Sequence, residues 1–260
     1  MKIALVSLNQ IWEDKESNLS ECEKYVEKAS QENVDLIVFP EMTLTGFSTN
    51  IIVTAEHENT SKSIEAFSNL AKKYSIALIF GVVIQDNDKA LNKSIFINQQ
   101  GETIGDYSKI HPFSFAGENK YFNGGDKLVV VNFEGMNIGL TVCYDLRFPE
   151  LYSSLGSRCD LIVNIANWPA KRVDHWNTLL KARAIENQIF IAGVNRTRID
   201  GNGLEYIESS NVFNANGEEM KFEKYEDMKI YEIDTNWTKE FKSKFNTTND
   251  RKIEFYKEIL

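Results

Sequence analysis

The stretch from Gly135 to Glu150 constrains the fold of this chain more than any other part of the sequence. Apolar residues alternate there with small or polar ones, which predicts a half-buried strand containing Ile138, Leu140 and Val142. Cys143 ends this strand, and a helix is expected to open near Arg147, because Pro149 is tolerated in a first helical turn. A thiol in this position lies beside unpaired backbone N–H groups and a positive dipole end, so we expect its thiolate form to be favoured. The alternative is a small buried core cysteine.

The size and composition of the chain favour one large domain. With 260 residues, of which 42% are hydrophobic, the chain can bury a sizeable core, and we predict a single domain over residues 1–260. The formal net charge of −9 argues against nucleic acid or an anionic membrane surface as a partner. No apolar run approaches the roughly eighteen residues of a membrane-spanning helix, so we expect no membrane segment.

The cysteines and histidines narrow the chemistry further. The three cysteines, Cys22, Cys143 and Cys159, are scattered and form neither a disulfide framework nor a paired metal motif. The first eight residues are too short and too strand-like for a signal peptide, so we expect the protein in a reducing cytoplasm. The three histidines lie far apart in the sequence, which argues against a zinc site.

Apolar periodicity along the chain alternates between strand and helix patterns. Strand patterns occur at residues 3–8, 35–39, 77–84, 93–98, 102–108, 138–142, 160–166, 189–195, 206–213 and 229–233. Helix patterns occur at residues 17–33, 61–74 and 173–188. This alternation, mixed with hairpins, is typical of an α/β protein with helices outside its sheets. Cys22 lies on the apolar stripe of the first helix, where core packing explains it better than chemistry does.

Three chemically useful residues, Glu41, Lys109 and Cys143, follow apolar strands. Because the ends of strands in layered α/β folds meet at one edge of the sheet, where ligands bind, we expect the three side chains to lie together. Taken singly, each has a plainer explanation. Glu41 could be a solvated turn residue, and Lys109 a surface charge.

Together the three side chains suit acyl transfer. Cys143 would attack a carbonyl or nitrile carbon, and Glu41 would take the thiol proton, pass it to leaving ammonia and then activate water. Lys109 and the backbone N–H of Tyr144 would face the developing oxyanion. Histidine is the usual base, but no histidine occupies a comparable strand end. His111 is the nearest rival, and its place before a proline favours a structural turn.

Three segments stand out when they are taken together: Phe39–Met42, Tyr107–His111 and Val142–Glu150. In residue type and in order they resemble the signature segments of the nitrilase superfamily, the carbon–nitrogen hydrolases, and the resemblance runs over essentially the whole chain. It implies an α/β fold of four layers, an αββα sandwich, with a triad at Glu41, Lys109 and Cys143. It also implies catalysis without a metal or organic cofactor, and a homodimer built on the helices that follow the Cys143 and Asp160 strands.

The family also uses a second glutamate before an aromatic–Gly–Asp loop, and the segment Glu118–Asp126 resembles that loop. The resemblance implies that Glu118 holds Lys109 and the substrate nitrogen through hydrogen bonds. A solvated loop glutamate is the alternative.

Three further segments bear on the substrate: Ala166–Arg172, His175–Trp176 and Ala182–Gln188. They resemble the bacterial omega-amidase-like branch of the family, which deaminates 2-oxoglutaramate and related omega-amides of short dicarboxylic acids. The resemblance therefore implies a small-molecule amide substrate. Related substrates stay open, namely an N-carbamoyl amino acid, a nitrile or a deaminated glutathione-like amide. A catalytically silent scaffold is a further alternative, against which the intact trio argues.

A carboxylate-bearing substrate needs a cation in the pocket. Arg147, four residues past the nucleophile, has a fork suited to a carboxylate, with a structural ion pair to Asp145 or Glu150 as the alternative. Lys171 and Arg172 are further candidates. Two aromatic residues could wall the pocket, with plain core packing as the alternative for each: Trp168 and Phe115.

Overall fold

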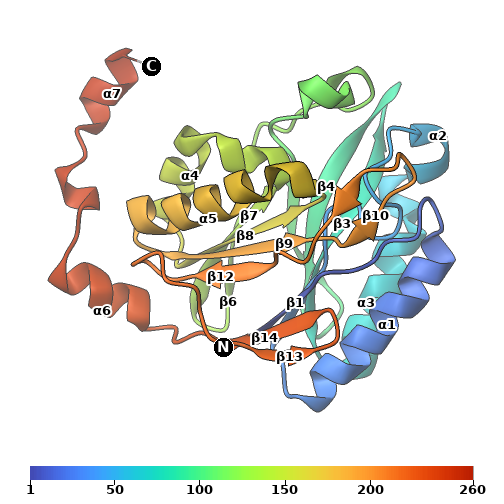
Figure 1. Ribbon diagram of the computed structural model, residues 1–260, viewed down its shortest axis with the longest axis horizontal. Coiled ribbons are helices and arrows are strands. Elements are labelled where there is room, and N and C mark those ends of the chain that lie inside the picture. The colour runs from blue at the N-terminus through green and yellow to red at the C-terminus, as the bar shows by residue number, and fades with distance from the viewer. Residues whose placement is uncertain (260) are drawn as a thin grey trace.

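The computed structural model describes residues 1–259 and shows two main β-sheets between layers of helices (Figure 1). The larger sheet has seven strands, in the order β13 (Glu223–Tyr225), β14 (Met228–Glu232), β1 (Lys2–Val6), β2 (Leu36–Val38), β3 (Ala77–Asp86), β4 (Lys89–Ile97) and β5 (Thr103–Ser108). The smaller sheet has five, in the order β12 (Asn211–Phe213), β9 (Phe190–Asn195), β8 (Leu161–Ala166), β7 (Met136–Val142) and β6 (Val130–Phe133). A separate hairpin pairs β10 (Arg198–Ile199) with β11 (Glu205–Tyr206).

The helices occupy the outer layers and the C-terminal end. They are α1 (Lys15–Gln31), α2 (Ile51–Thr54), α3 (Lys62–Tyr74), α4 (Pro149–Gly156), α5 (Val173–Asn187), α6 (Trp237–Lys244) and α7 (Ile253–Ile259). Short 3₁₀ turns are η1 (Glu58–Thr60), η2 (Ser114–Ala116), η3 (Glu118–Lys120), η4 (Cys143–Arg147), η5 (Ala170–Arg172) and η6 (Thr248–Asp250). Polar caps start two of the long helices, because the side chain of Asp14 accepts the backbone N–H of Ser17 and that of Ser61 accepts the N–H of Ile64.

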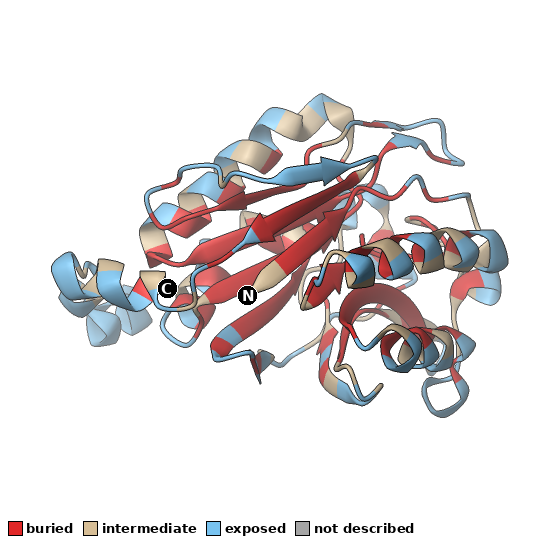
Figure 2. Ribbon diagram, turned by 90° about the horizontal axis from the view of Figure 1, so that it is seen from below, coloured by how far each residue is buried: buried red, intermediate tan, exposed pale blue. Residues whose placement is uncertain are grey.

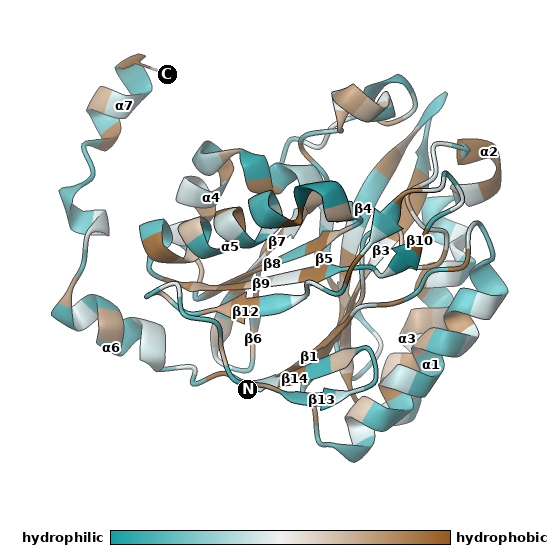
Figure 3. Cartoon of the chain, viewed as in Figure 1, coloured by the Kyte–Doolittle hydropathy of each residue, from teal (hydrophilic) through white to brown (hydrophobic). Residues whose placement is uncertain are grey.

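The alternation of side chains along the strands builds the four layers. In β1, Ile3 and Leu5 belong to the core shared with the smaller sheet, whereas Ala4 and Val6 belong to the core shared with α1 and α3. On its outer face the smaller sheet packs against α4 and α5. Figure 2 shows most of the strands buried and the outer sides of the helices exposed, and Figure 3 shows a similar division by hydropathy. The fold is therefore the predicted αββα sandwich.

Parallel pairing at the centre of each sheet brings several strand ends to one edge. Strands β1, β2 and β3 are mutually parallel, as are β7, β8 and β9. Strand β5 runs in the same direction as β3, because each is antiparallel to β4. The residues that follow β2, β5, β7 and β8 can therefore meet, and these are the segments with the candidate catalytic residues.

Two sequence expectations differ from the structure in detail. The strand expected over residues 206–213 is divided into β11 and β12. Between them, Ser209 and Ser210 bond to Asn195 at the end of β9 instead of continuing the strand. The helix expected to open near Arg147 begins at Pro149, because the 3₁₀ turn η4 occupies Cys143–Arg147.

The C-terminal segment runs along the smaller-sheet side of the molecule and ends clear of it (Figure 1). Trp237 of α6 packs against Phe190, with ring centroids 5.4 Å apart, and Arg251 donates to Ser153 of α4. Helix α7 leaves three apolar side chains at least half exposed: Ile253, Phe255 and Ile259. Within residues 1–259, no helix is long and apolar enough to cross a membrane.

Candidate active site

Glu41 lies in a turn after β2 that is fixed by its neighbours. The Nε2 of Gln10 donates to the backbone carbonyls of residues 41, 42 and 43, at 3.0, 2.9 and 3.2 Å. Met42 has a φ of 46°, in the left-handed region. Gly81 of β3 lets the turn pack directly on the strand, since a Cβ there would lie 2.2 Å from the backbone nitrogen of Met42. The Glu41 carboxylate is thereby held fully buried.

Lys109, directly after β5, lies between two buried carboxylates. Its Nζ is 2.9 Å from Oε1 of Glu41, and 3.1 and 2.9 Å from Oε1 and Oε2 of Glu118. Burial by itself would lower the pKa of Lys109, but the charges of Glu118 and Glu41 outweigh it and raise that pKa above its ordinary value. The ammonium group therefore stays charged, and the two carboxylates together more than balance its charge.

Two asparagines that the sequence analysis did not single out complete the surroundings of Glu41. The Nδ2 of Asn92 on β4 donates to Oε1 of Glu41 at 2.7 Å and to Oε1 of Glu118 at 3.0 Å. The backbone N–H of Asn167 donates to Oε2 of Glu41 at 2.9 Å. Asn167 follows β8 directly and so sits at a strand end like Glu41 and Cys143, a signal that could have found it. Asn92 lies inside a strand, where only its polarity marks it.

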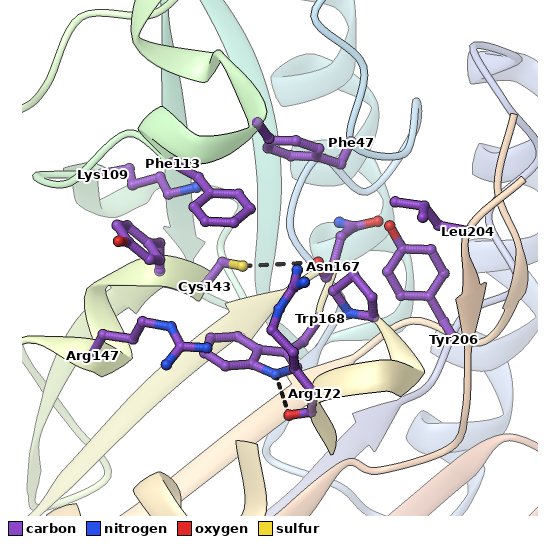
Figure 4. Close-up of a pocket in the computed structure, with 13 residues that line it drawn as sticks. Phe47, Lys109, Phe113, Cys143, Arg147, Asn167, Trp168, Arg172, Leu204 and Tyr206 are labelled. Carbon is purple, nitrogen blue, oxygen red and sulfur yellow. Dashed lines mark hydrogen bonds between the residues drawn. The ribbon is translucent and has the colours of Figure 1, made fainter. Parts of the chain in front are cut away.

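Cys143 is the first residue of η4, directly after β7, and its backbone is strained. Its φ of 47° is in the left-handed region, and its backbone N–H donates to Oδ1 of Asn164 on β8 at 3.0 Å. The Sγ atom points toward the backbone carbonyl of Asn167, 3.9 Å away (Figure 4). This geometry turns the thiol toward the pocket rather than into the core.

The expectation that the Cys143 thiolate is favoured is wrong. Burial, with the charge of Glu41 added to it, raises the pKa of the Cys143 thiol well above its ordinary value, although Lys109 acts in the opposite direction. The N–H of Cys143 is already used by Asn164, and a 3₁₀ turn rather than an α-helix follows directly. The resting thiol is therefore protonated, and a base must remove its proton.

His111 has a structural position, as its sequence context suggests. Its ring and its backbone N–H both contact Oδ1 of Asp145, at 2.8 and 3.0 Å, and Tyr107 donates to Oδ2 of the same carboxylate at 2.7 Å. Asp145 also accepts the N–H of Val142. These contacts join the segment that carries Lys109 to the turn that carries Cys143.

A small pocket, partly open to solvent, lies over the thiol. Figure 4 shows its walls, to which Cys143, Lys109 and Tyr144 contribute together with Arg147, Trp168 and Arg172. Aromatic and apolar residues that the sequence analysis missed supply most of the rest: Phe47, Phe113, Ala116, Pro169, Leu204 and Tyr206. They come from four separate segments of the chain, so no local pattern marks them.

Phe115 does not line the pocket, contrary to expectation. Its side chain is 87% exposed, whereas Phe113 and Ala116 face the cavity. In a 3₁₀ turn, residues three apart lie on one side, so η2 directs residues 113 and 116 inward and residue 115 outward. Lys171 is also exposed and does not belong to the pocket wall.

Two arginines give the pocket positive charge. The guanidinium of Arg147 lies 4.8 Å from the ring centroid of Trp168, and its Nη2 is 3.3 Å from Nδ1 of His175. The guanidinium of Arg172 lies 5.6 Å from the ring of Phe113. Within residues 1–259 no carboxylate lies within ion-pair distance of either arginine, so the alternative ion pair of Arg147 is not formed. By contrast, Arg183 and Glu186 of α5, three residues apart, form an ion pair at 3.1 Å.

Comparisons with known proteins agree with this geometry. Residues 2–242 match the carbon–nitrogen hydrolase family. The omega-amidase YafV of Yersinia enterocolitica is 39% identical over 222 residues, which cover 84% of this chain and 83% of the relative. The 2-oxoglutaramate amidase of Bacillus subtilis is 31% identical over 182 residues, which cover 69% of this chain and 70% of the relative.

Solved structures share the fold. XC1258 from Xanthomonas campestris, a CN-hydrolase superfamily protein with an arsenic adduct in its active site, has a TM-score of 0.90 at 29% identity, covering 96% of this chain and 97% of its own. An amidase from Nesterenkonia sp. AN1, with acrylamide added at its active-site cysteine, has a TM-score of 0.87 at 22% identity and covers 100% of both chains. With the family match over nearly its whole length, the chain belongs to the carbon–nitrogen hydrolases of the nitrilase superfamily and is a hydrolase that acts on amides.

Proposed function

We propose that the protein hydrolyses the terminal amide of a small dicarboxylic acid monoamide, of the 2-oxoglutaramate type, to a carboxylate and ammonia through a thioester on Cys143. One observation carries this proposal. A single pocket combines the thiol and Lys109, which is held by Glu41 and Glu118, with two arginines that have no carboxylate partner in residues 1–259. The similarity to an omega-amidase and to a 2-oxoglutaramate amidase supports it.

In the first half of the reaction, Glu41 acts as the general base. Because the pKa of the Cys143 thiol is raised, Glu41 takes the proton as Sγ attacks the amide carbon, and the carbonyl electron pair moves to oxygen. Glu41 then gives that proton to the amide nitrogen. The C–N bond breaks, ammonia leaves, and a Cys143 thioester remains.

The oxyanion formed by this attack needs donors. Lys109 lines the pocket, and its Nζ makes two contacts to Glu118, one of which can be exchanged for the substrate oxygen. The backbone N–H of Tyr144, the residue after the nucleophile, is the second donor we assign. Glu118, which also accepts the N–H of Phe113, keeps Lys109 oriented and accepts an N–H of the amide.

In the second half, water replaces ammonia at the acyl carbon. Glu41 takes a proton from the attacking water, the C–S bond breaks, and the leaving thiolate takes that proton back. The product leaves as a carboxylic acid, which gives up its proton to ammonia or solvent and becomes the carboxylate, and the enzyme returns to its resting form. One carboxylate thus serves both halves, and the complete reaction consumes only the amide and one water molecule.

The two arginines bind the carboxylate at the other end of the substrate. Glu41 and Glu118 exceed the charge of Lys109 by one negative charge, so Arg147 and Arg172 together leave the site with a net positive charge. A guanidinium fork binds a carboxylate with two parallel hydrogen bonds. Trp168, which donates its indole N–H to the backbone carbonyl of Arg172, supports this side of the pocket.

The test is ammonia release from a panel of omega-amides, N-carbamoyl amino acids and nitriles. We expect turnover of succinamate-type and 2-oxoglutaramate-type amides, lost in Cys143→Ala and kept in Cys22→Ala and Cys159→Ala, which also remove a buried thiol. Turnover that survives in Cys143→Ala would overturn the mechanism. Ammonia from carbamoyl acids or nitriles alone would overturn the substrate class and keep the nucleophile.

Three further features of this proposal follow from the family resemblance and from composition. The reaction uses neither a metal nor an organic cofactor, the enzyme works in a reducing cytoplasm, and it pairs as a homodimer. The apolar side chains that α7 leaves exposed give some support to pairing, because a second copy could cover them.

A further inference from the structure

We infer that Asn92 is a positioning residue of the active site, which holds Glu41 and Glu118 in one arrangement around Lys109. The inference rests on the proposed function, because the roles of those three charged residues are the ones proposed above. It adds a fourth residue that does not touch the substrate.

Asn92 contacts every charged member of the cluster. Its Nδ2 donates to Oε1 of Glu41 at 2.7 Å and to Oε1 of Glu118 at 3.0 Å. Its backbone carbonyl accepts the N–H of Lys109 at 2.8 Å. Its side chain is 1% exposed, and Nδ2 uses its hydrogen bonds on the two carboxylates. It therefore acts through its neighbours.

The sheet explains why this position can reach all three. Asn92 lies in β4, between β3 and β5, and the side chains of alternate residues on a strand share a face. On that face Asn92 points to the edge where the turn after β2 and the segment after β5 come together. Ser94, two residues on, shares the face, but its hydroxyl makes no hydrogen bond to the cluster or to any other group within residues 1–259.

The two polar atoms of the Asn92 amide, Nδ2 and Oδ1, differ in their hydrogen bonding. Only Nδ2 can donate to two carboxylates, so the orientation of the amide is fixed by its partners. Oδ1 is then buried, and no protein group in residues 1–259 donates to it. An acceptor buried in this way costs stability, so an apolar residue would serve the core better. We infer that the amide of Asn92 is present for its hydrogen bonds to Glu41 and Glu118, since residues that are unfavourable for packing occur most often at functional sites.

Two carboxylates that share one ammonium repel each other, and a neutral donor to both offsets that repulsion. Without it, the donors to the Glu41 carboxylate within residues 1–259 are Lys109 and the backbone N–H of Asn167. A base displaced by a fraction of an ångström transfers its proton poorly. Because the pocket wall is unchanged, the effect should fall on kcat and leave KM alone.

The experiment compares Asn92→Ala with Ser94→Ala, a matched truncation on the same face of the same strand. We expect kcat for an omega-amide to fall about 10- to 100-fold in Asn92→Ala, with KM within about twofold of wild type. The rate of Cys143 alkylation by iodoacetamide should fall with kcat, because Glu41 activates the thiol. Ser94→Ala should match wild type in all three quantities.

A second variant guards against misfolding. Asn92→Ser can donate to one carboxylate but not to both, and should show a kcat between those of Asn92→Ala and wild type. If Asn92→Ala does not fold, this variant carries the test alone. Unchanged kcat and alkylation in a folded variant, or a loss confined to KM, would overturn the inference.

Failure of the proposed function looks different. Wild-type protein that releases no ammonia from any omega-amide would contradict the substrate, whereas the alkylation rates would still report whether Asn92 positions the base.

Discussion

Arg147 offers a direct test of how the pocket selects its substrate. The substitution Arg147→Met removes the guanidinium and keeps an unbranched stem over Trp168. Arg147 has no carboxylate partner within residues 1–259, so the change leaves no buried charge unpaired. We therefore expect the folded state to be as stable as wild type, which separates a binding effect from a folding effect.

The size of the effect follows from the contacts. A hydrogen bond to a charged group contributes about 1.5–3 kcal/mol, and a half-buried side chain such as Arg147 belongs at the lower end. Since about 1.4 kcal/mol corresponds to a factor of ten, kcat/KM for succinamate should fall about tenfold. Butyramide carries a methyl group in place of the carboxylate, and its kcat/KM should not change.

The assay is ammonia release from both substrates by wild type, Arg147→Met, Arg172→Met and Lys171→Met. Lys171 is the matched control, because it is exposed and lies outside the pocket wall. Equal losses for succinamate and butyramide in Arg147→Met would refute the reasoning, since they would mean that Arg147 supports the pocket and does not bind the carboxylate. A comparable loss in Lys171→Met would point to a long-range charge effect instead.

Glu41→Gln should slow iodoacetamide labelling of Cys143 and block both halves of the reaction. Glu118→Gln should leave the labelling rate unchanged and lower turnover by about two orders of magnitude. Labelling is read from the mass of the modified peptide, and the reverse pattern would assign the base to Glu118. Burial raises the pKa of the Cys159 thiol from its ordinary value of 9.0 to about 12, so the folded state favours the protonated thiol. The contribution of this thiol to the free energy of unfolding is therefore complete below about pH 9 and is lost as the pH rises toward 12. Cys159→Ala should flatten the fall in unfolding free energy over that window in urea titrations. Light scattering should show a dimer, and a stable monomer at micromolar concentration would contradict the expected pairing.

The sequence predicts those parts of the fold that depend on local periodicity. Alternation in β1 assigns Ile3 and Leu5 to one core and Ala4 and Val6 to the other, and that division follows from the strand repeat alone. The meeting of Glu41, Lys109 and Cys143 could also be foreseen, because each follows a strand and parallel strands end at one edge.

Other features depend on contacts between distant segments and carry no local signal. Asn92 acquires its neighbours only when β4 pairs with β3 and β5. The direction of Phe115 depends on the 3₁₀ geometry of η2, which sequence periodicity does not specify. The raised pKa of Cys143 reflects its final burial beside Glu41, whereas the sequence shows only its place between a strand and a helix.

The close approach of Gly81 to the Glu41 turn has a consequence for protein engineering. Replacing glycine by alanine in a strand is a common way to stabilise an enzyme, because it restricts the unfolded chain. At position 81 the added methyl group would lie 2.2 Å from the nitrogen of Met42 and 2.8 Å from the carbonyl carbon of Glu41. The turn cannot shift freely while Gln10 holds its carbonyls, so the displacement would reach the carboxylate. A substitution library that keeps every pocket residue and varies only β3 should therefore lose activity at this position.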